Sequence, residues 1–171
     1  MRILGIDPGY AIVGIGVLDY IPHKFNVVYY GAILTEAKTP FTKRLGEIYN
    51  DMISVIDRTK PDVVSIEKLF FNTNQKTGID VAQARGVIVL AAEQKGLPVY
   101  EYTPLQVKQS VVGYGRAEKH QVMDMTRQIL HLKSVPKPDD TADALALAIC
   151  HAHTQGSQLN YFEKINLKGK I

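Results

Sequence analysis

Four carboxylates stand at the ends of predicted secondary-structure elements, far apart in the sequence. Asp7 follows the apolar run of the first predicted strand, Glu67 closes a later strand, and Asp140 and Asp143 open the last strong helix. Because carboxylates beside apolar runs lose solvation on folding, their charge calls for compensation by cations. Crowded oxygen ligands suit Mg²⁺ or Mn²⁺, and two such ions about 4 Å apart would clamp a phosphodiester for attack by water. The pattern predicts a metal-dependent nuclease, provided that folding brings the four acids together.

The two aspartates of the last helix also have a purely structural explanation. Taken alone, Asp140 is typical of a helix N-cap, and Asp143 is typical of a first-turn acid favoured by the helix macrodipole. Asp139 is expected to be a solvated or capping residue rather than a ligand. Residues 140 and 143 share one helical face, so the choice between caps and ligands depends on the other motifs.

Size and composition predict one globular domain. With 171 residues and 46% hydrophobic content, the chain can fill one core but not two. We expect residues 1–154 to form the domain and residues 155–171 to be a weakly structured tail. A net charge of +3 and a pI near 8.9 permit a nucleic-acid partner without indicating one.

Cysteine and histidine usage argues against disulfides and zinc chemistry. The single Cys150 lies in an apolar helical stretch, and the five scattered histidines form no H-x-x-x-H pair. No basic and apolar leader opens the sequence, and no apolar run approaches the roughly 20 residues of a membrane span. We therefore expect a soluble, cytoplasmic protein.

The order of the predicted elements indicates a mixed α/β fold. Apolar or alternating runs predict strands over residues 3–6, 11–18, 25–34, 63–67 and 98–102. Amphipathic or small-residue runs predict helices over residues 40–56, 79–95, 103–113, 117–132 and 140–152. Three antiparallel hairpin-joined strands and two further parallel strands should form a five-stranded mixed sheet with helices on both faces. The first strand should lie centrally beside the strand that ends in Glu67, which brings Asp7 and Glu67 to one sheet edge.

Two helix starts carry recognisable caps. Thr39 should cap a helix that has Pro40 at its first position, because proline is tolerated there. Thr103 and Gln106 fit a capping box, in which each side chain bonds the backbone of the other residue.

The predicted strand over residues 11–18 carries glycines on one of its two faces. Gly14 and Gly16 alternate with β-branched residues along it. This period of two predicts a strand that another element approaches closely on its glycine face.

Several separated motifs resemble those of RuvC-type Holliday junction resolvases, members of the ribonuclease H and integrase superfamily. They cover about residues 1–153, and their order and spacing make the match specific. The motifs are Gly5-Ile-Asp-Pro-Gly9, Ile66-Glu67 with Phe70, Gln83-Ala-Arg-Gly86, Gln106-Val-Lys-Gln109, Val111-Val-Gly113, Ala117-Glu-Lys119 and Asp140-Thr-Ala-Asp-Ala-Leu-Ala146. A G-I-D-x-G start alone would also fit sugar kinases and actin-like ATPases.

This resemblance implies a ribonuclease H-like endonuclease that resolves four-way DNA junctions in recombination and repair. It assigns Asp7, Glu67, Asp140 and Asp143 as catalytic acids that hold two Mg²⁺ ions, with Mn²⁺ as a substitute. Some family members have His at position 140, whereas this chain has Asp. Paired symmetric nicks would leave 5′-phosphate and 3′-hydroxyl ends.

The resemblance also implies protein and DNA partners. A homodimer would form through the helix over residues 79–95, and a complex with a branch-migration helicase is expected. Phe70 would stack on a base at the junction centre, although Phe70 or Phe71 could instead fold into the core. The candidate DNA-binding residues are Phe70, Lys76, Arg85, Lys108, Arg116 and Lys119, of which the resemblance places Lys108 and Lys119 near the cleft. For any single cation among them, a solvated surface role is the alternative.

Two other functions stay open on the sequence alone. A ribonuclease H-fold RNase or rRNA-processing nuclease would share the first motif and the acids but act on RNA. A non-catalytic junction-binding module would use the acids as caps and the lysines to hold phosphate. Cleavage of matched RNA and DNA substrates separates these possibilities from a junction endonuclease.

Overall fold

The computed structural model describes residues 1–22, 24–69 and 75–168, and their side chains except those of residues 75–77 and 156–168. The strands are β1 (Arg2–Asp7), β2 (Ile12–Ile21), β3 (Lys24–Leu34), β4 (Val63–Glu67) and β5 (Val99–Tyr102). The helices are α1 (Phe41–Thr59), α2 (Gln75–Gln94), α3 (Pro104–Val112), α4 (Lys119–Ile129) and α5 (Asp139–Lys168). Every strand and helix expected from the sequence is therefore present.

The five strands form one mixed sheet in the order β3-β2-β1-β4-β5. The pairs β1–β2 and β2–β3 are antiparallel, and the pairs β1–β4 and β4–β5 are parallel. This confirms the predicted topology, including the central place of β1 beside β4. The carboxyl ends of β1 and β4 consequently lie at one edge of the sheet.

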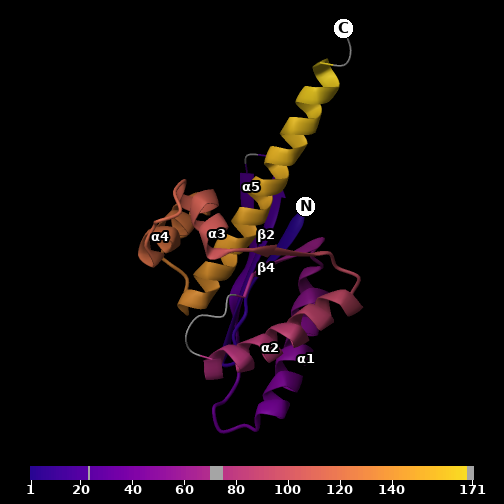
Figure 1. The fold of residues 1–171 in the computed structure, drawn as a ribbon, viewed down its shortest axis with the longest axis vertical. Helices are drawn as coiled ribbons and strands as arrows, with labels where there is room; N and C mark the ends of the chain where they lie inside the picture. The colour runs from indigo at the N-terminus through magenta and orange to yellow at the C-terminus, as the bar shows by residue number, and fades with distance from the viewer. Residues whose placement is uncertain (23, 70–74, 169–171) are drawn as a thin grey trace.

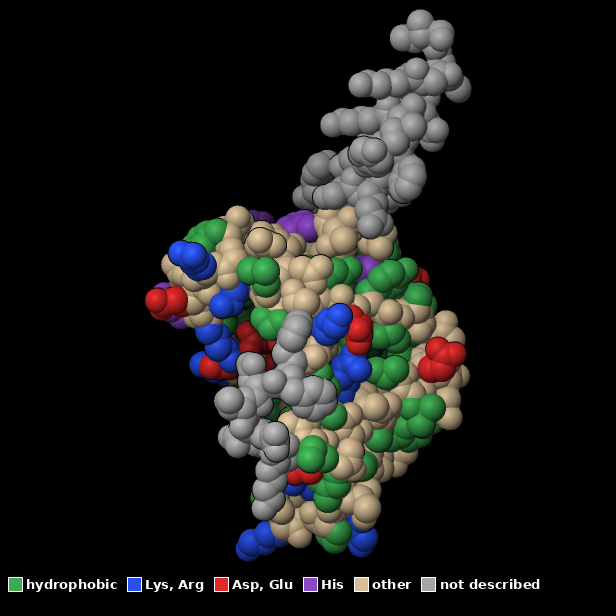
Figure 2. Space-filling model, viewed as in Figure 1, with side chains coloured by type: hydrophobic (Ala, Val, Ile, Leu, Met, Phe, Trp, Pro, Cys, Tyr) green, Lys and Arg blue, Asp and Glu red, His purple; other side chains and the backbone are tan. Residues whose placement is uncertain are grey.

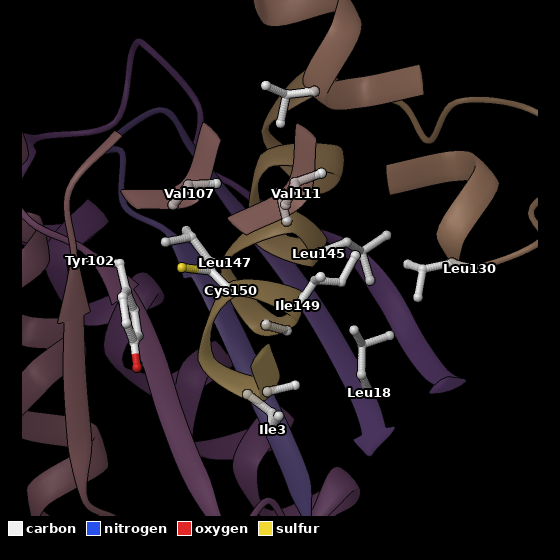
Figure 3. Packing of buried hydrophobic residues seen from close by; sticks show 14 of the residues in the cluster. Ile3, Leu18, Tyr102, Val107, Val111, Leu130, Leu145, Leu147, Ile149 and Cys150 are labelled. Atoms are coloured by element: carbon white, nitrogen blue, oxygen red, sulfur yellow. The ribbon is translucent and has the colours of Figure 1, made fainter. Parts of the chain in front are cut away.

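Helices cover both faces of the sheet, as predicted (Figure 1). Alternate residues of β1 face opposite ways: Ile3 packs with α3, α4 and α5, whereas Leu4 packs with α1 and α2. On the first face, α5 lies between the sheet and α3. In Figure 3, Leu147 and Ile149 of α5 lie between Ile3 of the sheet and Val107 of α3. This arrangement makes α5 the central helix of that face.

The structure confirms the predicted cap of α3 and corrects that of α1. The capping box of α3 is confirmed: Gln106 N donates to Thr103 Oγ1 over 3.1 Å, and Thr103 N donates to Gln106 Oε1 over 2.8 Å. The predicted cap of α1 is wrong, because Pro40 and not Thr39 is the N-cap residue. Pro40 has an extended ψ of 137°, so only its carbonyl takes part in the helix, accepting from Lys43 N and Arg44 N.

The last helix is longer than predicted. The expected end was near residue 152, with a weakly structured tail over residues 155–171, but α5 runs to Lys168. No proline follows Pro138 in the sequence, so the backbone keeps every donor that a continuing helix needs. The division into a domain over residues 1–154 and a separate tail stays a prediction. Among the described residues, no helix is both long and apolar enough to cross a membrane.

Three glycines bring α5 into backbone contact with β1 and β2. A Cβ atom on Gly5 would lie 2.0 Å from the carbonyl oxygen of Ala144, and one on Gly14 would lie 2.0 Å from that of Asp140. A Cβ atom on Gly16 would lie 2.8 Å from Leu145 N. The close approach expected on the glycine face of residues 11–18 is therefore confirmed, and α5 is the element that makes it.

Gly5→Ala should destabilise the protein by at least about 2 kcal/mol, because the added methyl group collides with backbone that cannot turn aside. Gly46→Ala in α1 is the matched control, since a Cβ atom there meets nothing within 4 Å. It should raise the free energy of unfolding by about 0.5–1 kcal/mol through helix propensity. Urea unfolding measures both changes, and equal effects of the two substitutions would contradict the close packing of α5.

His151 should make stability fall in acid. The side chain is 1% exposed, its Nδ1 lies 2.8 Å from Tyr102 Oη, and its Nε2 has no hydrogen-bond partner among the described residues. Burial lowers the pKa of His151 to about 4. Between about pH 6.5 and pH 4, the unfolded chain therefore binds a proton that the folded chain refuses, and the free energy of unfolding falls as pH falls, by up to about 1.4 kcal/mol per pH unit.

The control variant is His151→Gln, which keeps an acceptor for Tyr102 but cannot titrate. Its free energy of unfolding should fall less steeply than that of the unmodified protein from pH 6.5 to pH 4. Denaturant unfolding at several pH values gives the slopes, and identical slopes would show that His151 does not titrate differently in the two states.

Candidate active site

Asp7 and Glu67 are the final residues of adjacent parallel strands. Ile6 of β1 is paired with Ile66 of β4, so the residues that follow them leave the sheet side by side. The carboxyl groups of Asp7 and Glu67 share a hydrogen bond. The structure thus brings together two acids that are 60 residues apart, as the parallel pairing predicted.

Asp140 and Asp143 approach this edge from the start of α5. The helix begins at Asp139, so Asp140 lies within the first turn and the sequence-based alternative of an N-cap role does not hold. Contact between Gly14 and the Asp140 backbone places this turn against β2. The charges of Asp140 and Asp143 both act on Asp7, which puts acids from β1, β4 and α5 in one cluster.

The cluster is costly to ionise in the absence of a cation. Burial, and then the charges of Glu67 and Asp143, raise the pKa of Asp7 to about 8. Burial also raises the pKa of Glu67, while the hydrogen bond from Asp7 opposes this rise. We infer that Asp7 carries the shared proton and donates it to Glu67, because two ionised carboxylates cannot share a hydrogen bond.

Lys119 supplies positive charge to the cluster. Its Nζ lies 2.9 Å from Asp143 Oδ2, with the lysine side chain 58% exposed and the aspartate side chain 29% exposed. Burial raises the pKa of Asp143, and the hydrogen bond from Lys119 opposes that rise. Lys119 is the first residue of α4, and at the start of this helix Glu118 N donates to Gln121 Oε1 over 2.8 Å. A cation at a helix N-terminus is disfavoured by the macrodipole, so the acids must supply the compensation.

A cleft of about 200 Å³ opens beside the acids. Its charged lining consists of the acids Glu67 and Asp143 and the lysines Lys108 and Lys119. Its apolar lining consists of Pro104, Val107, Val122 and Leu147. Figure 2 shows side chains of both charges gathered over α4 and the start of α5. The cleft therefore presents carboxylates and ammonium groups to the same space.

The other predicted DNA-binding residues lie in different settings. Arg116 is exposed in the turn before α4. Arg85 is 17% exposed, and its guanidinium bonds the Glu101 side chain and the Glu67 carbonyl. Phe70 and the side chain of Lys76 lie outside the described residues. The predicted roles of all four in DNA binding stay predictions.

The donor set fits a hard divalent cation, although the described side chains would have to adjust. No group of three or more acidic, histidine or cysteine side chains within residues 1–22, 24–69 and 78–155 is close enough to hold one ion as it stands. The proton on Asp7 and the ammonium group of Lys119 occupy the carboxylates instead. Carboxylate oxygens without nitrogen or sulfur donors suit Mg²⁺ or Mn²⁺. An ion would replace positive charge that the cluster already attracts.

Two features of the site were missed in the sequence. The hydrogen bond from Glu118 N to the Gln121 side chain at the start of α4 had a signal, because the two residues have the spacing of a capping box. The partner of Arg85 had none, since Glu101 is one exposed acid among many along the chain. Only the parallel pairing of β4 with β5 places Glu101 near the end of the Glu67 strand.

Comparisons with known proteins agree on a family. A family model described as Crossover junction endodeoxyribonuclease RuvC matches residues 3–151. The Crossover junction endodeoxyribonuclease RuvC of Ruminiclostridium cellulolyticum is 56% identical over 161 residues, which cover 93% of this chain and 97% of that protein. The protein of the same name from Clostridioides difficile is 55% identical over 172 residues and covers 99% of each chain.

Solved structures agree with the sequence relatives. Thermus thermophilus RuvC in complex with a Holliday junction substrate matches with a TM-score of 0.87 and 36% identity, over 92% of this chain and 96% of that one. The yeast mitochondrial Holliday junction resolvase matches with a TM-score of 0.69 over 95% of this chain and 82% of that one; at 14% identity, this shows a shared fold. The sheet is ribonuclease H-like, and the family model matches residues 3–151. The chain therefore belongs to the RuvC family of crossover junction endodeoxyribonucleases.

Proposed function

We propose that this protein nicks two strands of like polarity at symmetric positions across a four-way DNA junction, with two divalent cations held by Asp7, Glu67, Asp140 and Asp143. The observation that carries this proposal is the meeting of acids from β1, β4 and α5 beside a lysine-lined cleft. The Thermus thermophilus relative is solved with a Holliday junction substrate, and we extend that substrate to this chain.

The cations would be Mg²⁺, with Mn²⁺ as a substitute; when bound, they would supply a water of lowered pKa and stabilise the leaving 3′ oxygen. Asp7 and Glu67 hold the sheet side of the site once Asp7 has lost its proton. Asp140 and Asp143 hold the helix side. Lys119, released from Asp143, turns its ammonium group toward DNA phosphate. The products are a 5′-phosphate and a 3′-hydroxyl.

Lys108 and Lys119 are the proposed phosphate contacts at the cleft, and Arg116, Lys76 and Phe70 are proposed to extend the DNA surface. Phosphate contacts of this kind fix the position of DNA without reading its sequence. A four-way junction is distinguished from duplex DNA by its shape, so phosphate contacts of this kind suit a structure-selective enzyme.

A homodimer would supply two active sites related by the same two-fold axis as the two cuts. We propose α2 as the interface, because Ile79 and Leu90 are apolar side chains about half exposed on this helix. A branch-migration helicase is a further proposed partner. Since the substrate is cellular DNA under repair, the proposed location is the cytoplasm.

The test is a nicking assay on a synthetic four-way junction with Mg²⁺, beside an RNA junction of the same sequence and a linear duplex. Symmetric nicks in the DNA junction alone would support the proposal. Preferred cleavage of RNA would select the ribonuclease alternative, and metal-independent binding without nicking would select the binding module. Family membership favours the DNA junction over both.

Asp7→Asn should abolish nicking while junction binding persists, because the substitution removes a charged ligand at nearly constant shape. It should also raise the free energy of unfolding of the metal-free protein, since burial and neighbouring carboxylates disfavour the ionised Asp7. Asp139→Asn is the matched control, because the Asp139 carboxylate is ion-paired with Lys137 and acts on Asp143 through its charge rather than through a hydrogen bond. It should nick within about threefold of the unmodified rate. Nicking by Asp7→Asn within tenfold, about 1.4 kcal/mol in barrier, would remove Asp7 from the site.

Lys119→Met should bind Mn²⁺ more tightly in the absence of DNA, by about two- to fivefold, because the ammonium group no longer competes for Asp143. The same substitution should slow nicking, since a phosphate contact is lost. Lys108→Met controls for loss of a lysine that lines the same cleft without a pairing to Asp143. Isothermal titration with Mn²⁺ measures the affinities, and equal affinities for the two variants would argue that Lys119 does not compete with the ion.

A further inference from the structure

Arg85 connects α2 to the ends of two strands. Its Nη2 donates to Oε1 of Glu101 on β5, and its Nε donates to the carbonyl oxygen of Glu67 on β4 over 3.4 Å. Glu101 is paired in register with Ile66, the residue before Glu67. One guanidinium group therefore spans the two parallel strands where the Glu67 side chain leaves the sheet.

The backbone around Glu67 has few other ties. The pairing of β4 with β5 ends with a hydrogen bond from Lys68 N to the Tyr102 carbonyl over 2.8 Å. Beyond that bond the chain leaves the strand, so the peptide group between Glu67 and Lys68 is the last one held by the pairing with β5. A planar guanidinium with several fixed donors can hold a carboxylate and a carbonyl at once. Arg85 thereby fixes the main chain from which the Glu67 carboxylate enters the acid cluster.

This setting differs from that of a phosphate-binding arginine. Arg85 is 17% exposed and already bonds a carboxylate and a backbone carbonyl. To reach DNA phosphate it would have to leave both partners, and Glu101 would repel the incoming phosphate. Arg116, by contrast, is exposed in the turn before α4. Two arginines with the same expected role therefore present different chemistry.

We propose that Arg85 is a positioning residue for Glu67 and does not contact DNA phosphate. It holds the Glu67 peptide through its Nε and is itself held by Glu101. Loss of Arg85 lets the Glu67 carboxylate move relative to Asp7, which weakens cation binding and slows the chemical step. The inference rests on the proposed role of Glu67 as an active-site acid.

The experiment measures binding and chemistry separately in Arg85→Gln and Arg85→Lys. Junction affinity is measured in Ca²⁺ at several salt concentrations, and single-turnover nicking is measured with saturating protein over a range of Mg²⁺ concentrations. Both variants should bind within about twofold of the unmodified protein, with an unchanged salt slope. Both should nick at least about tenfold more slowly, since displacements of an ångström at reacting groups cost up to a hundredfold. Both should also require more Mg²⁺ for half-maximal rate.

The Arg85→Lys variant separates the two roles of a cation. This substitution keeps a positive charge and a bond to Glu101, but a single ammonium group cannot reproduce the planar fork. A phosphate contact would instead be largely restored by lysine, which binds phosphate as a point charge. Near-normal nicking by Arg85→Lys together with weak binding by Arg85→Gln would overturn the inference.

Three controls complete the design. Arg116→Gln should lower the salt slope of binding by about one, as expected for a lost phosphate contact. Glu101→Gln keeps an acceptor for Arg85 and should slow nicking less than Arg85→Gln does. Thermal unfolding reports the folded fraction, and a loss of rate that only follows this fraction would contradict a positioning role.

Glu67→Gln distinguishes a failure of this inference from a failure of the proposed site. If Glu67→Gln nicks normally, the assignment of Glu67 to the site is wrong and Arg85 has nothing to position there. If Glu67→Gln is inactive while Arg85→Gln nicks at the unmodified rate, the site stands and the positioning role is wrong.

Discussion

The rest of this structure depends on how closely α5 lies on the sheet. Gly5, Gly14 and Gly16 leave room for helix backbone where any side chain would collide with it. Two hydrogen bonds then fix the helix along its axis: Ser65 Oγ donates to the Leu147 carbonyl over 2.7 Å, and Thr141 Oγ1 donates to the Gly31 carbonyl over 3.0 Å. Because the first turn of α5 carries two of the four acids, this contact decides where those acids lie relative to the strand ends.

The same contact brings carboxylates so close together that they repel one another when ionised, and the fold alone does not offset this repulsion. Acids delivered by β1, β4 and α5 meet in a partly buried space, and burial raises the pKa of Asp7 to about 8. A retained proton on Asp7 and the ammonium group of Lys119 offset part of the repulsion. Neither the proton nor the ammonium group can replace a metal ion in hydrolysis. The proton occupies an oxygen that a metal ion would need, and a lysine cannot activate water as a divalent cation does. The metal-free site is stable only in a form that must change before it can act.

Much of this arrangement could be predicted from the sequence, because it follows from local patterns. The alternation along β2 predicted both a strand and a closely approached glycine face, and parallel pairing predicted the meeting of Asp7 with Glu67. Side-chain partners across elements could not be predicted. The bond between Arg85 and Glu101 depends on the register of β5 and the rotation of α2, neither of which leaves a signature in composition. The length of α5 was missed for a related reason, since a polar segment without proline permits a helix without requiring one.

One helix, α5, connects the parts of the fold that carry the acids and the lysines of the cleft. One side of α5 packs on the sheet, and another side places Leu147 against Val107 of α3 (Figure 3). Val122 of α4 belongs to the same buried cluster. The carboxylates belong to the sheet and to α5, whereas Lys108 and Lys119 belong to α3 and α4. A shift of α5 on the sheet would carry Asp140 and Asp143 away from Asp7 and Glu67, and it would carry the packed helices α3 and α4 along with it. A loss of packing between α5 and the helices α3 and α4 would instead separate the lysines from the acids while the acid cluster stayed intact, so binding and cleavage of DNA are physically separable in this fold.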